Sequence, residues 1–522
     1  IGSQAPDRRF KDQIVLDLTM IKKIIWLHLL AGLLTTCQHD VSPPQPNIIY
    51  ILADDLGYGD LGCLNPESRI ETPHIDRLAE QGIRFTDAHS PSSVCSPTRY
   101  GILTGRYAWR TELKRSVLWA WDGPLIEPDR PTVGSFLQDQ GYSTACIGKW
   151  HLGWKWQTID SSHMNDSIPL GRQDFRARYD FGKKVDFSKP LQDGPITRGF
   201  DYYFGDDVPN FPPYTYIEND RVLEIPQVEK PDSMFGSPGP MREGWQLDQV
   251  LPEITQKAVE YIKARTGGER FKRKKGQPFF LYFPLTAPHT PIAPSPEFKG
   301  RSRAGAYGDY VQEVDWVVGQ VMSAVSESGQ ERETLLIFTS DNGSPARDGT
   351  QMSGPVNSVL RFGHHPSFIF RGTKADIWEG GHRVPFLAMW PGQIRPGSKS
   401  DETICLTSLM ATLADILGVS LPEGAGEDSH SILKALMGGE LPDDHVTVHH
   451  SIQGMFAVRK GNWKWIDGKG SGGWSEGGQD DSLPGQLYNL MEDPGEQINL
   501  FTAHQEKVRE LKELLDSCKN ER

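Results

Sequence analysis

A cysteine and an arginine four positions apart are the first side chains in this sequence that could do chemistry. Cys95 and Arg99 lie in the stretch 92–99. Pro97 suits the first turn of a helix, because the N–H that proline lacks has no partner there. Cys95 would then lie at the start of that helix, where free amides and the helix dipole favour negative charge, and Arg99 would share its face. The pattern predicts an anion-handling site, and the alternative is a buried thiol beside an ordinary helix cap.

Three carboxylates and an amide directly follow two stretches that resemble buried strands. These side chains belong to Asp54, Asp55, Asp341 and Asn342. The stretches 47–53 and 334–340 are rich in apolar and β-branched residues, which is typical of a parallel sheet covered on both faces. Open α/β sheets bind ligands at the carboxyl ends of their strands. Because all four groups offer oxygen, they suit a hard cation such as Ca²⁺ or Mg²⁺ better than zinc, and the alternative is a solvated turn.

Two further strand-like stretches end in basic or titratable groups. The stretch 142–148 leads into Lys149 and His151, and the stretch 279–283 leads into His289. Taken singly, each such group is typical of a protein surface. If the four strands are neighbours, however, their charged ends converge on one pocket.

Helical patterns alternate with these strands. The segments 72–82, 132–141 and 306–327 have caps or an apolar face at helical spacing. This alternation predicts a layered α/β domain. The stretch 154–244 has weak periodicity and many Pro, Asp and aromatic residues, so we predict long loops over the pocket.

The pattern changes after about residue 440. Short strand-like runs occur at 446–448, 455–459, 463–466 and 486–490, and a helical pattern follows at 505–518. They predict a small α+β subdomain with an antiparallel sheet. The predicted parts of the chain are therefore an upstream segment (1–41), a catalytic domain (42–440) and a C-terminal subdomain (441–522).

The upstream segment carries the features of an export signal. Lys22 and Lys23 precede an apolar run, residues 24–34, which is too short to span a bilayer and suits a secretory signal. We expect translation to start at Met20. Cys37 follows a sequence similar to a bacterial lipoprotein cleavage site and is the predicted lipid anchor, although Thr36 is unusual before it. The alternative is a buried amphipathic helix.

Composition limits the classes of partner. The chain has 522 residues and a formal net charge of −13, which argues against nucleic acid. An anionic substrate would therefore need a locally positive pocket. The basic stretch 263–276 is predicted to be a solvated loop. None of the six cysteines forms a CxxC pair, which argues against a zinc site.

The stretch around Cys95 also resembles a known signature. Cys95-Ser-Pro-Thr-Arg99 with Leu103-Thr-Gly-Arg106 is similar to the hallmark of type I sulfatases, members of the alkaline phosphatase superfamily. Family-like motifs recur over nearly all of residues 47–515. They read Asp-Asp-Leu-Gly-Tyr-Gly-Asp (54–60), Gly-Lys-Trp-His-Leu-Gly (148–153), Ala-Pro-His-Thr-Pro (287–291), Ser-Asp-Asn-Gly (340–343), Glu-Gly-Gly-His-Arg-Val-Pro (379–385) and Leu-Tyr-Asn-Leu-x-x-Asp-Pro-x-Glu (487–496). The resemblance implies an alkaline-phosphatase-like sandwich, with a large mixed β-sheet between helices and a small C-terminal antiparallel sheet.

The resemblance also implies cofactors. A maturation enzyme would oxidise Cys95 to formylglycine, whose hydrate attacks sulfur. One Ca²⁺ ion would be bound by this modified residue and by the four oxygen donors, Asp54, Asp55, Asp341 and Asn342.

Roles for the remaining site residues follow from the same resemblance. Lys149 and Lys374 would hold sulfate oxygens, and Arg99 would support the modified side chain. His289 would protonate the departing alkoxide. His151 would accept a proton from the hydrate so that the aldehyde re-forms and sulfate leaves.

We therefore expect an exported, arylsulfatase-like sulfuric ester hydrolase that acts on a sulfated carbohydrate, in the bacterial periplasm or anchored to the outer membrane. Loop position makes Asp207, Asn210 and His382 the candidate sugar contacts. The first alternative is a phosphate or phosphonate ester hydrolase of the same superfamily, against which the pair Lys149 and Lys374 and a single-metal ligand set argue. The second is a lipoprotein that binds sulfated glycans without turnover, against which the intact histidines argue.

Overall fold

Ten strands form one mixed sheet, and its central five are parallel. In spatial order they are β13 (Ser398–Ser400), β2 (Ile83–Phe85), β12 (Phe386–Met389), β11 (Thr334–Ser340), β1 (Asn47–Asp54), β10 (Phe279–Pro288), β4 (Ser143–Ile147), β5 (Tyr202–Gly205), β6 (Ile217–Glu218) and β7 (Arg221–Val222). The strands from β11 to β5 run in the same direction. Their carboxyl ends therefore share one edge of the sheet, as the sequence predicted.

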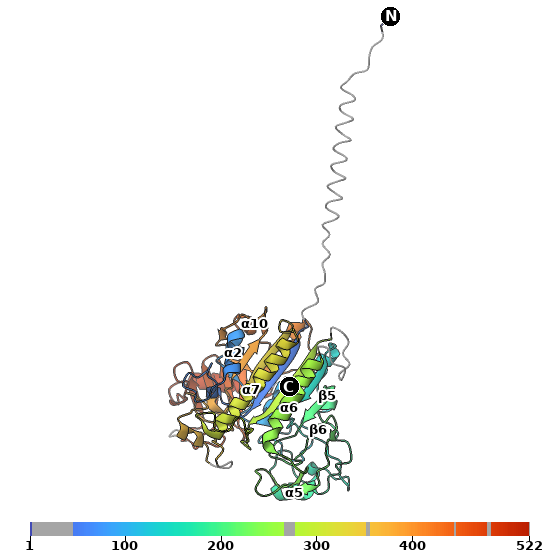
Figure 1. The fold of residues 1–522 in the computed structure, drawn as a ribbon. Coiled ribbons are helices and arrows are strands. Elements are labelled where there is room, and N and C mark those ends of the chain that lie inside the picture. The colour runs from blue at the N-terminus through green and yellow to red at the C-terminus, as the bar shows by residue number, and fades with distance from the viewer. Residues whose placement is uncertain (3–44, 266–276, 351–354, 443–444, 478–481, 521–522) are drawn as a thin grey trace. The chain divides into compact units, whose positions relative to one another are not determined.

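The computed structural model describes residues 1–2, 45–265, 277–350, 355–442, 445–477 and 482–520 (Figure 1). The predicted export signal, Cys37 and most of the basic stretch 263–276 lie outside the described residues. The elements discussed here belong to the unit Gln45–Arg522. Within the described ranges, no helix has both the length and the apolar character needed to cross a membrane.

Alternate residues of β1 explain why this strand is central. Ile48, Tyr50 and Leu52 belong to one apolar cluster, and Ile49 and Ile51 belong to the other. Every residue of the strand is buried. Because side chains of a strand point alternately to the two faces, a continuous apolar run needs cover on both.

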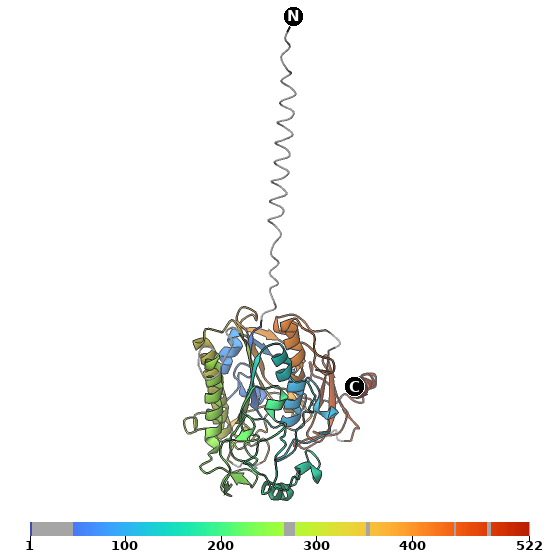
Figure 2. The same ribbon diagram turned by 90° about the vertical axis from the view of Figure 1, so that its right-hand side faces the viewer.

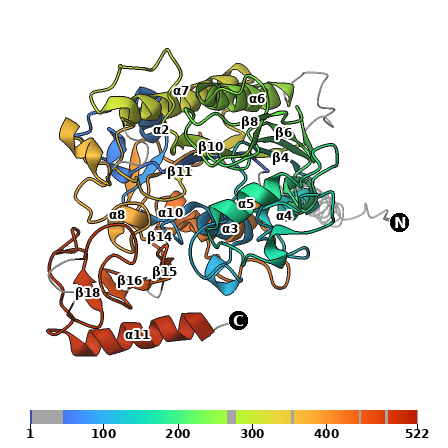
Figure 3. The same ribbon diagram turned by 90° about the horizontal axis from the view of Figure 1, so that it is seen from below.

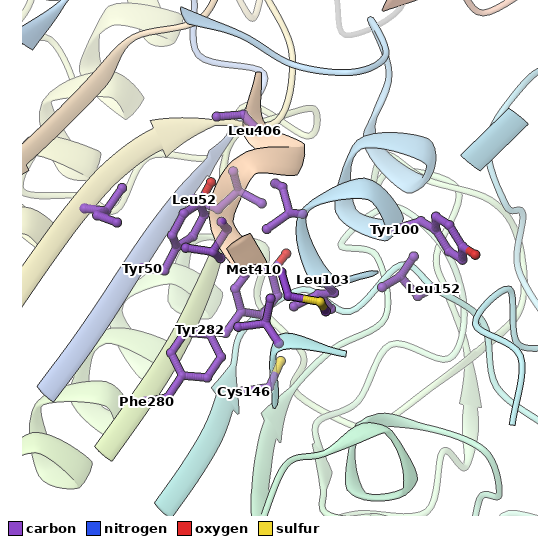
Figure 4. Packing of buried hydrophobic residues seen from close by; sticks show 14 of the residues in the cluster. Tyr50, Leu52, Tyr100, Leu103, Cys146, Leu152, Phe280, Tyr282, Leu406 and Met410 are labelled. Carbon is purple, nitrogen blue, oxygen red and sulfur yellow. The ribbon is translucent and has the colours of Figure 1, made fainter. Parts of the chain in front are cut away.

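Helices supply that cover on both faces (Figure 2). One face packs against α2 (Pro73–Gln81), α6 (Val250–Ala264) and α7 (Gly305–Glu327). The other packs against α3 (Cys95–Thr104), α4 (Val133–Asp139), α9 (Leu409–Leu417) and α10 (Leu433–Leu436). On that second face, Leu103 and Met410 belong to the same apolar cluster as Tyr50 and Leu52 of β1 (Figure 4). The predicted sandwich of a mixed sheet between helices is confirmed.

A separate four-stranded antiparallel sheet follows near the C-terminus (Figure 3). Its strands are β15 (Val446–His450), β16 (Phe456–Lys460), β17 (Trp463–Ile466) and β18 (Gln486–Asn489). One face packs against α11 (Gln505–Asn520). The other face contributes Ala457 and Ile466 to a cluster with Ile377 and Trp378. The predicted small sheet is confirmed, whereas the boundary near residue 440 stays a prediction.

The stretch 154–244 contains more regular structure than we predicted. The helix α5 (Phe175–Gly182) and the strands β5, β6 and β7 lie within it, and β5 pairs directly with β4. The interpretation as loops is therefore wrong for these segments, while much of the remaining stretch lies outside helices and strands. Its strands contain only two to four residues, which is too few to show a clear period.

Short elements complete the described chain. The remaining strands are β3 (Ala88–His89), β8 (Val228–Glu229), β9 (Pro240–Met241) and β14 (Ile404–Cys405). A one-turn helix, α8 (Glu379–His382), precedes β12. The 3₁₀ turns are η1 (Tyr58–Asp60), η2 (Ala108–Arg110), η3 (Met164–Asp166), η4 (Pro195–Arg198), η5 (Leu247–Gln249), η6 (Ser358–Phe362) and η7 (Leu406–Ser408).

Candidate functional site

Cys95 is the first residue of α3, and Pro97 lies in its first turn, as predicted. The helix ends at Gly105, whose φ of 63° is left-handed and suits glycine. All ten residues of the helix are buried, including Arg99. The cysteine is therefore held at the buried end of a helix, directly beside the carboxyl edge of the sheet.

The predicted oxygen donors meet at this edge because β1 and β11 are adjacent parallel strands. The N–H of Asp341 donates to the carbonyl of Ala53 at 3.0 Å. The N–H of Asp55 donates to Asp341 Oδ1 at 3.2 Å, and Asn342 Nδ2 donates to Asp55 Oδ1 at 2.8 Å. Asp55 has a φ of 69°, a left-handed conformation that is uncommon for aspartate. This turn brings the two adjacent carboxylates, Asp54 and Asp55, into the same cluster.

Three buried cations surround the carboxylates. Arg99 donates to Asp341 Oδ2 at 2.8 and 3.1 Å. Lys149 Nζ donates to Asp54 Oδ2 at 2.7 Å. Lys374 Nζ lies 2.5 Å from Asp55 Oδ1. The sheet edge is therefore a dense ionic cluster, in which each carboxylate has a positive partner.

Burial and charge act against each other on these groups. Burial alone would raise the pKa of Asp54, but Lys149 and its other cationic neighbours hold that pKa well below 3.8. Burial and the charge of Asp54 raise the pKa of Asp341 to about 7. Burial raises the pKa of Cys95 to about 12. The unmodified Cys95 side chain is therefore a neutral thiol near pH 7 and a poor nucleophile.

The two predicted histidines are fixed in defined orientations. His289 Nδ1 bonds to the carbonyl of Thr290, which leaves Nε2 free, 3.9 Å from Asp55 Oδ2. His151 Nε2 donates to the carbonyl of Leu118 at 2.9 Å. His151 Nδ1 has no hydrogen-bond partner among the described residues. Burial lowers the pKa of both rings, to about 4 for His289, so both are neutral near pH 7.

Five of these groups line a cavity of about 840 Å³ and form what we call its floor: Asp55, Cys95, His151, His289 and Lys374. Lys374 Nζ lies 3.5 Å from Cys95 Sγ on this floor. The walls include the aromatic side chains of Trp119, Phe175, Phe211, Phe235 and Trp474. Rings that offer an apolar face beside polar groups suit a sugar. The arrangement can hold an anion against buried cations while aromatic faces contact its carrier.

The candidate sugar contacts occupy three different positions. Asn210 lines the cavity. Asp207 lies behind it and accepts from the N–H of His151 at 3.2 Å and from Trp154 Nε1 at 3.3 Å. His382 is fully buried beneath the C-terminal sheet, where Lys464 Nζ lies 3.0 Å from its Nε2. Neither Asp207 nor His382 lines the cavity, so the sugar contacts expected of them stay predictions that this geometry does not support.

Some cavity residues come from distant segments and were not predicted. Ile452 and Trp474, which lie between strands of the C-terminal sheet, line the cavity, as does Arg347. Arg347 stacks on Trp474 with its guanidinium carbon 5.4 Å from the ring centroid. A tryptophan in the Gly- and Ser-rich stretch 470–475 was the available signal, because such stretches seldom need a large aromatic ring.

Comparison with known proteins places this geometry in a family. The sulfatase family model matches residues 46–419. The chain belongs to the sulfatase family. It is 33% identical to an N-acetylgalactosamine-6-O-sulfatase of Bacteroides thetaiotaomicron, over 94% of this chain and 98% of that protein. It is 31% identical to human arylsulfatase A, over 87% of this chain and 83% of the relative.

Solved structures agree with this assignment. A Bacteroides thetaiotaomicron structure, described with that organism's metabolism of multiple glycosaminoglycans, superposes with a TM-score of 0.77. It is 31% identical, and the match covers 92% of this sulfatase and all of that chain. The protein is thus a sulfuric ester hydrolase with the family's large mixed sheet and small antiparallel sheet.

Proposed function

We propose that this sulfatase removes sulfate from a sulfated carbohydrate, with 6-sulfated N-acetylgalactosamine as the first candidate. The observation that carries the proposal is the cavity floor, where Lys374 Nζ lies 3.5 Å from Cys95 Sγ under aromatic walls. Two relatives, from Bacteroides thetaiotaomicron and from dog, are named for the 6-sulfate of N-acetylgalactosamine. Their names supply the choice of sugar.

The donor set fits a calcium ion. Asn342 Oδ1 is buried and has no hydrogen-bond partner among the described residues. The possible ligand atoms of Asp54, Asp55, Cys95 and His289 lie within 4.8 Å of one another. Carboxylate and amide oxygens are the ligands that Ca²⁺ prefers. Asp54, Asp55, Asp341 and Asn342 would hold the ion, which when bound supplies positive charge next to the sulfate oxygens.

We propose that Cys95 is converted to formylglycine by a maturation enzyme. The neutral, buried thiol supports this, because it lacks the thiolate that a cysteine nucleophile needs. When formed, the aldehyde hydrate supplies a hydroxyl group to attack sulfur and can later release the sulfate. Arg99, which donates to the carbonyl of Lys149 at 3.0 Å as well as to Asp341, would hold the surrounding groups in place.

The other residues would bind sulfate and move protons. Lys374 lines the floor, whereas Lys149 is buried against Asp54 and is not part of the lining. We propose that both pair with sulfate oxygens, since such charges stabilise a transition state better than water does. His289 Nε2 would deliver a proton to the departing alkoxide, and a bound anion would favour its protonated form. His151 would accept a proton at Nδ1, since its other ring nitrogen is held by a backbone carbonyl.

Hydrolysis of matched esters tests the proposal. The protein is produced with a formylglycine-generating enzyme, and conversion of Cys95 is measured by mass spectrometry. We expect release of sulfate from 6-sulfated N-acetylgalactosamine and from 4-nitrophenyl sulfate, much slower release from 4-nitrophenyl phosphate, and no activity for Cys95→Ala. Faster phosphate than sulfate release, or full activity of Cys95→Ala, would overturn the proposed chemistry.

We also propose that the protein is exported and carries a lipid at Cys37. The support is the sequence pattern before that residue. Intact mass of the protein from membranes, with and without a lipoprotein signal peptidase inhibitor, tests this separately from activity.

A further inference from the structure

A second cavity, rich in cations, adjoins the catalytic one. Its volume is about 560 Å³, and it is lined by residues from the segments 112–115 and 169–173. Gln173 lines both cavities, so the two are neighbours. A molecule that fills the first and extends past Gln173 therefore meets the second.

The second cavity is held together by close backbone packing. Gly171 has a φ of 72°, and a Cβ at this position would lie 2.5 Å from Leu113 Cδ1. Its N–H donates to Asp122 Oδ2 at 3.1 Å. The N–H of Ser116 donates to the carbonyl of Ile452, a residue of the catalytic cavity, at 2.7 Å. Hydrogen bonds donated by backbone N–H groups thus connect both lining segments, or residues next to them, to segments that pack around the catalytic cavity.

The lining is positive in a chain that is strongly negative overall. Lys114, Arg115 and Arg172 face one acid, Glu112, which leaves a local charge of +2 against the formal −13 of the whole chain. Lys114 Nζ donates to the carbonyl of Trp109 at 2.7 Å. Arg115 and Arg172 are exposed, and neither guanidinium has a hydrogen bond or ion pair within the described part of the chain. Two guanidinium groups are therefore available to a ligand.

We propose that this cavity binds a second anionic group, a carboxylate or a sulfate, on a sugar that neighbours the one being desulfated. The inference rests on the proposed function and narrows its substrate to a polyanionic oligosaccharide. The planar fork of arginine matches the oxygens of either anion with two parallel hydrogen bonds. The cation-rich cavity would thus recognise the neighbouring sugar of the oligosaccharide, whereas the catalytic cavity would recognise the sulfated sugar itself.

Kinetics with substrates of different length test the inference. The probes are 6-sulfated N-acetylgalactosamine and tetrasaccharides in which this sugar alternates with a hexuronate. We expect Arg115→Ala/Arg172→Ala to lower kcat/KM about tenfold on the tetrasaccharide and to leave it within about twofold on the monosaccharide. The control is Arg176→Ala, because Arg176 is exposed on α5 and lines neither cavity.

Chemically altered tetrasaccharides distinguish the two anions. If the carboxylate is bound, reduction of the uronate to a neutral sugar abolishes the tenfold difference between wild type and the double variant. If a second sulfate is bound, the difference survives that reduction and disappears when the neighbouring sugar lacks sulfate. Equal losses on monosaccharide and tetrasaccharide, or no loss on either, would overturn the proposal.

Binding without turnover separates this proposal from the proposed function. The Cys95→Ala protein is titrated with the same tetrasaccharide at rising NaCl concentration. We expect the Kd to be about tenfold higher, and less dependent on salt, when both arginines are replaced. An unchanged Kd refutes the second cavity, whereas a wild-type protein that binds normally but hydrolyses no sulfate ester refutes only the proposed function.

Discussion

Lys374 is the site cation whose removal gives the clearest test of the proposed sulfate pocket. Its side chain is 7% exposed and contacts both Asp55 and Cys95. Replacing it by methionine keeps most of the apolar stem and removes the charge. The backbone bond from its N–H to Ser344, at 2.9 Å, does not depend on the side chain. Lys374→Met should therefore alter the electrostatics of the pocket more than its shape.

The expected magnitude follows from the geometry. A sulfate oxygen at hydrogen-bond distance from Nζ gains about 5 kcal/mol at an effective dielectric constant of about 20. Part of this is lost because Asp55 already lies 2.5 Å from the same ammonium group. Removal of a single donor to a developing oxyanion typically costs about 2.7–4 kcal/mol. We therefore predict that Lys374→Met lowers kcat/KM for 4-nitrophenyl sulfate by about 100- to 1,000-fold.

Lys230 provides a matched control inside the same cavity. Its ammonium group already donates to the carbonyls of Pro231 and Met234, at 2.9 and 2.6 Å. Lys230→Met removes an equal charge from the cavity wall, but not from its floor, so kcat/KM should change by less than about threefold. Formylglycine content and Tm are measured for both variants so that failed maturation or folding is not mistaken for lost catalysis. Equal losses in the two variants, or near-normal activity of Lys374→Met, would refute the assignment.

Three further predictions concern stability, pH and metal. Burial raises the pKa of Asp206 from 3.8 to about 7, so the folded protein keeps a proton that the unfolded chain releases, and wild-type stability falls between about pH 4 and 7. The Asp206→Asn variant should therefore be more stable than wild type by about 2–4 kcal/mol above pH 7 and as stable as wild type near pH 4. Measuring the Tm of both proteins at several pH values tests this. An equal gain in stability at all pH values would contradict it. Lys464→Met should lower the free energy of unfolding in urea by about 3–5 kcal/mol, because Glu379 and Glu496 would lose a buried partner. Their carboxylates lie 3.0 and 2.8 Å from Lys464 Nζ. The control is Lys460→Met, at the half-exposed end of β16, which should change the free energy of unfolding little. Chelation of divalent ions should lower both activity and Tm, and Ca²⁺ should restore both; an unchanged Tm would argue against the metal site.

Strand ends explain why so much of the site was predictable. The runs that became β1 and β11 are rich in apolar and β-branched residues, so their burial follows from pattern, whereas their adjacency was only a condition of the prediction and is shown by the structure. Asp54 and Asp341 end those runs, and they meet because the two strands are parallel neighbours. Cys95 and Arg99 were placed by helix rules, and the family resemblance added their chemical roles. Local pattern was sufficient wherever a group sits at the end of a long, regular element.

Prediction failed where position depends on packing between distant segments. The four residues of β5 carry no readable period, and β5 is a strand because β4 pairs with it. His382 follows a polar, Gly-rich stretch that resembles a loop, yet the C-terminal sheet covers it and Lys464 reaches its ring. Trp474 lines the cavity because the loop between β17 and β18 of the C-terminal sheet packs beside it. Such contacts have no signature in nearby sequence, because the partner residues are far apart in the chain.

The C-terminal sheet also restrains the segment that precedes Cys95. The N–H of Ser93, two residues before Cys95, donates to the carbonyl of His450 at 3.0 Å, and the N–H of Ile452 donates to the carbonyl of Ala375 at 3.1 Å. Residues about 350 positions further along the chain thus hold the loop that carries the cysteine in place. A shortened chain that lacks this sheet should therefore leave the segment before Cys95 less restrained, which hydrogen exchange at the Ser93 amide would measure.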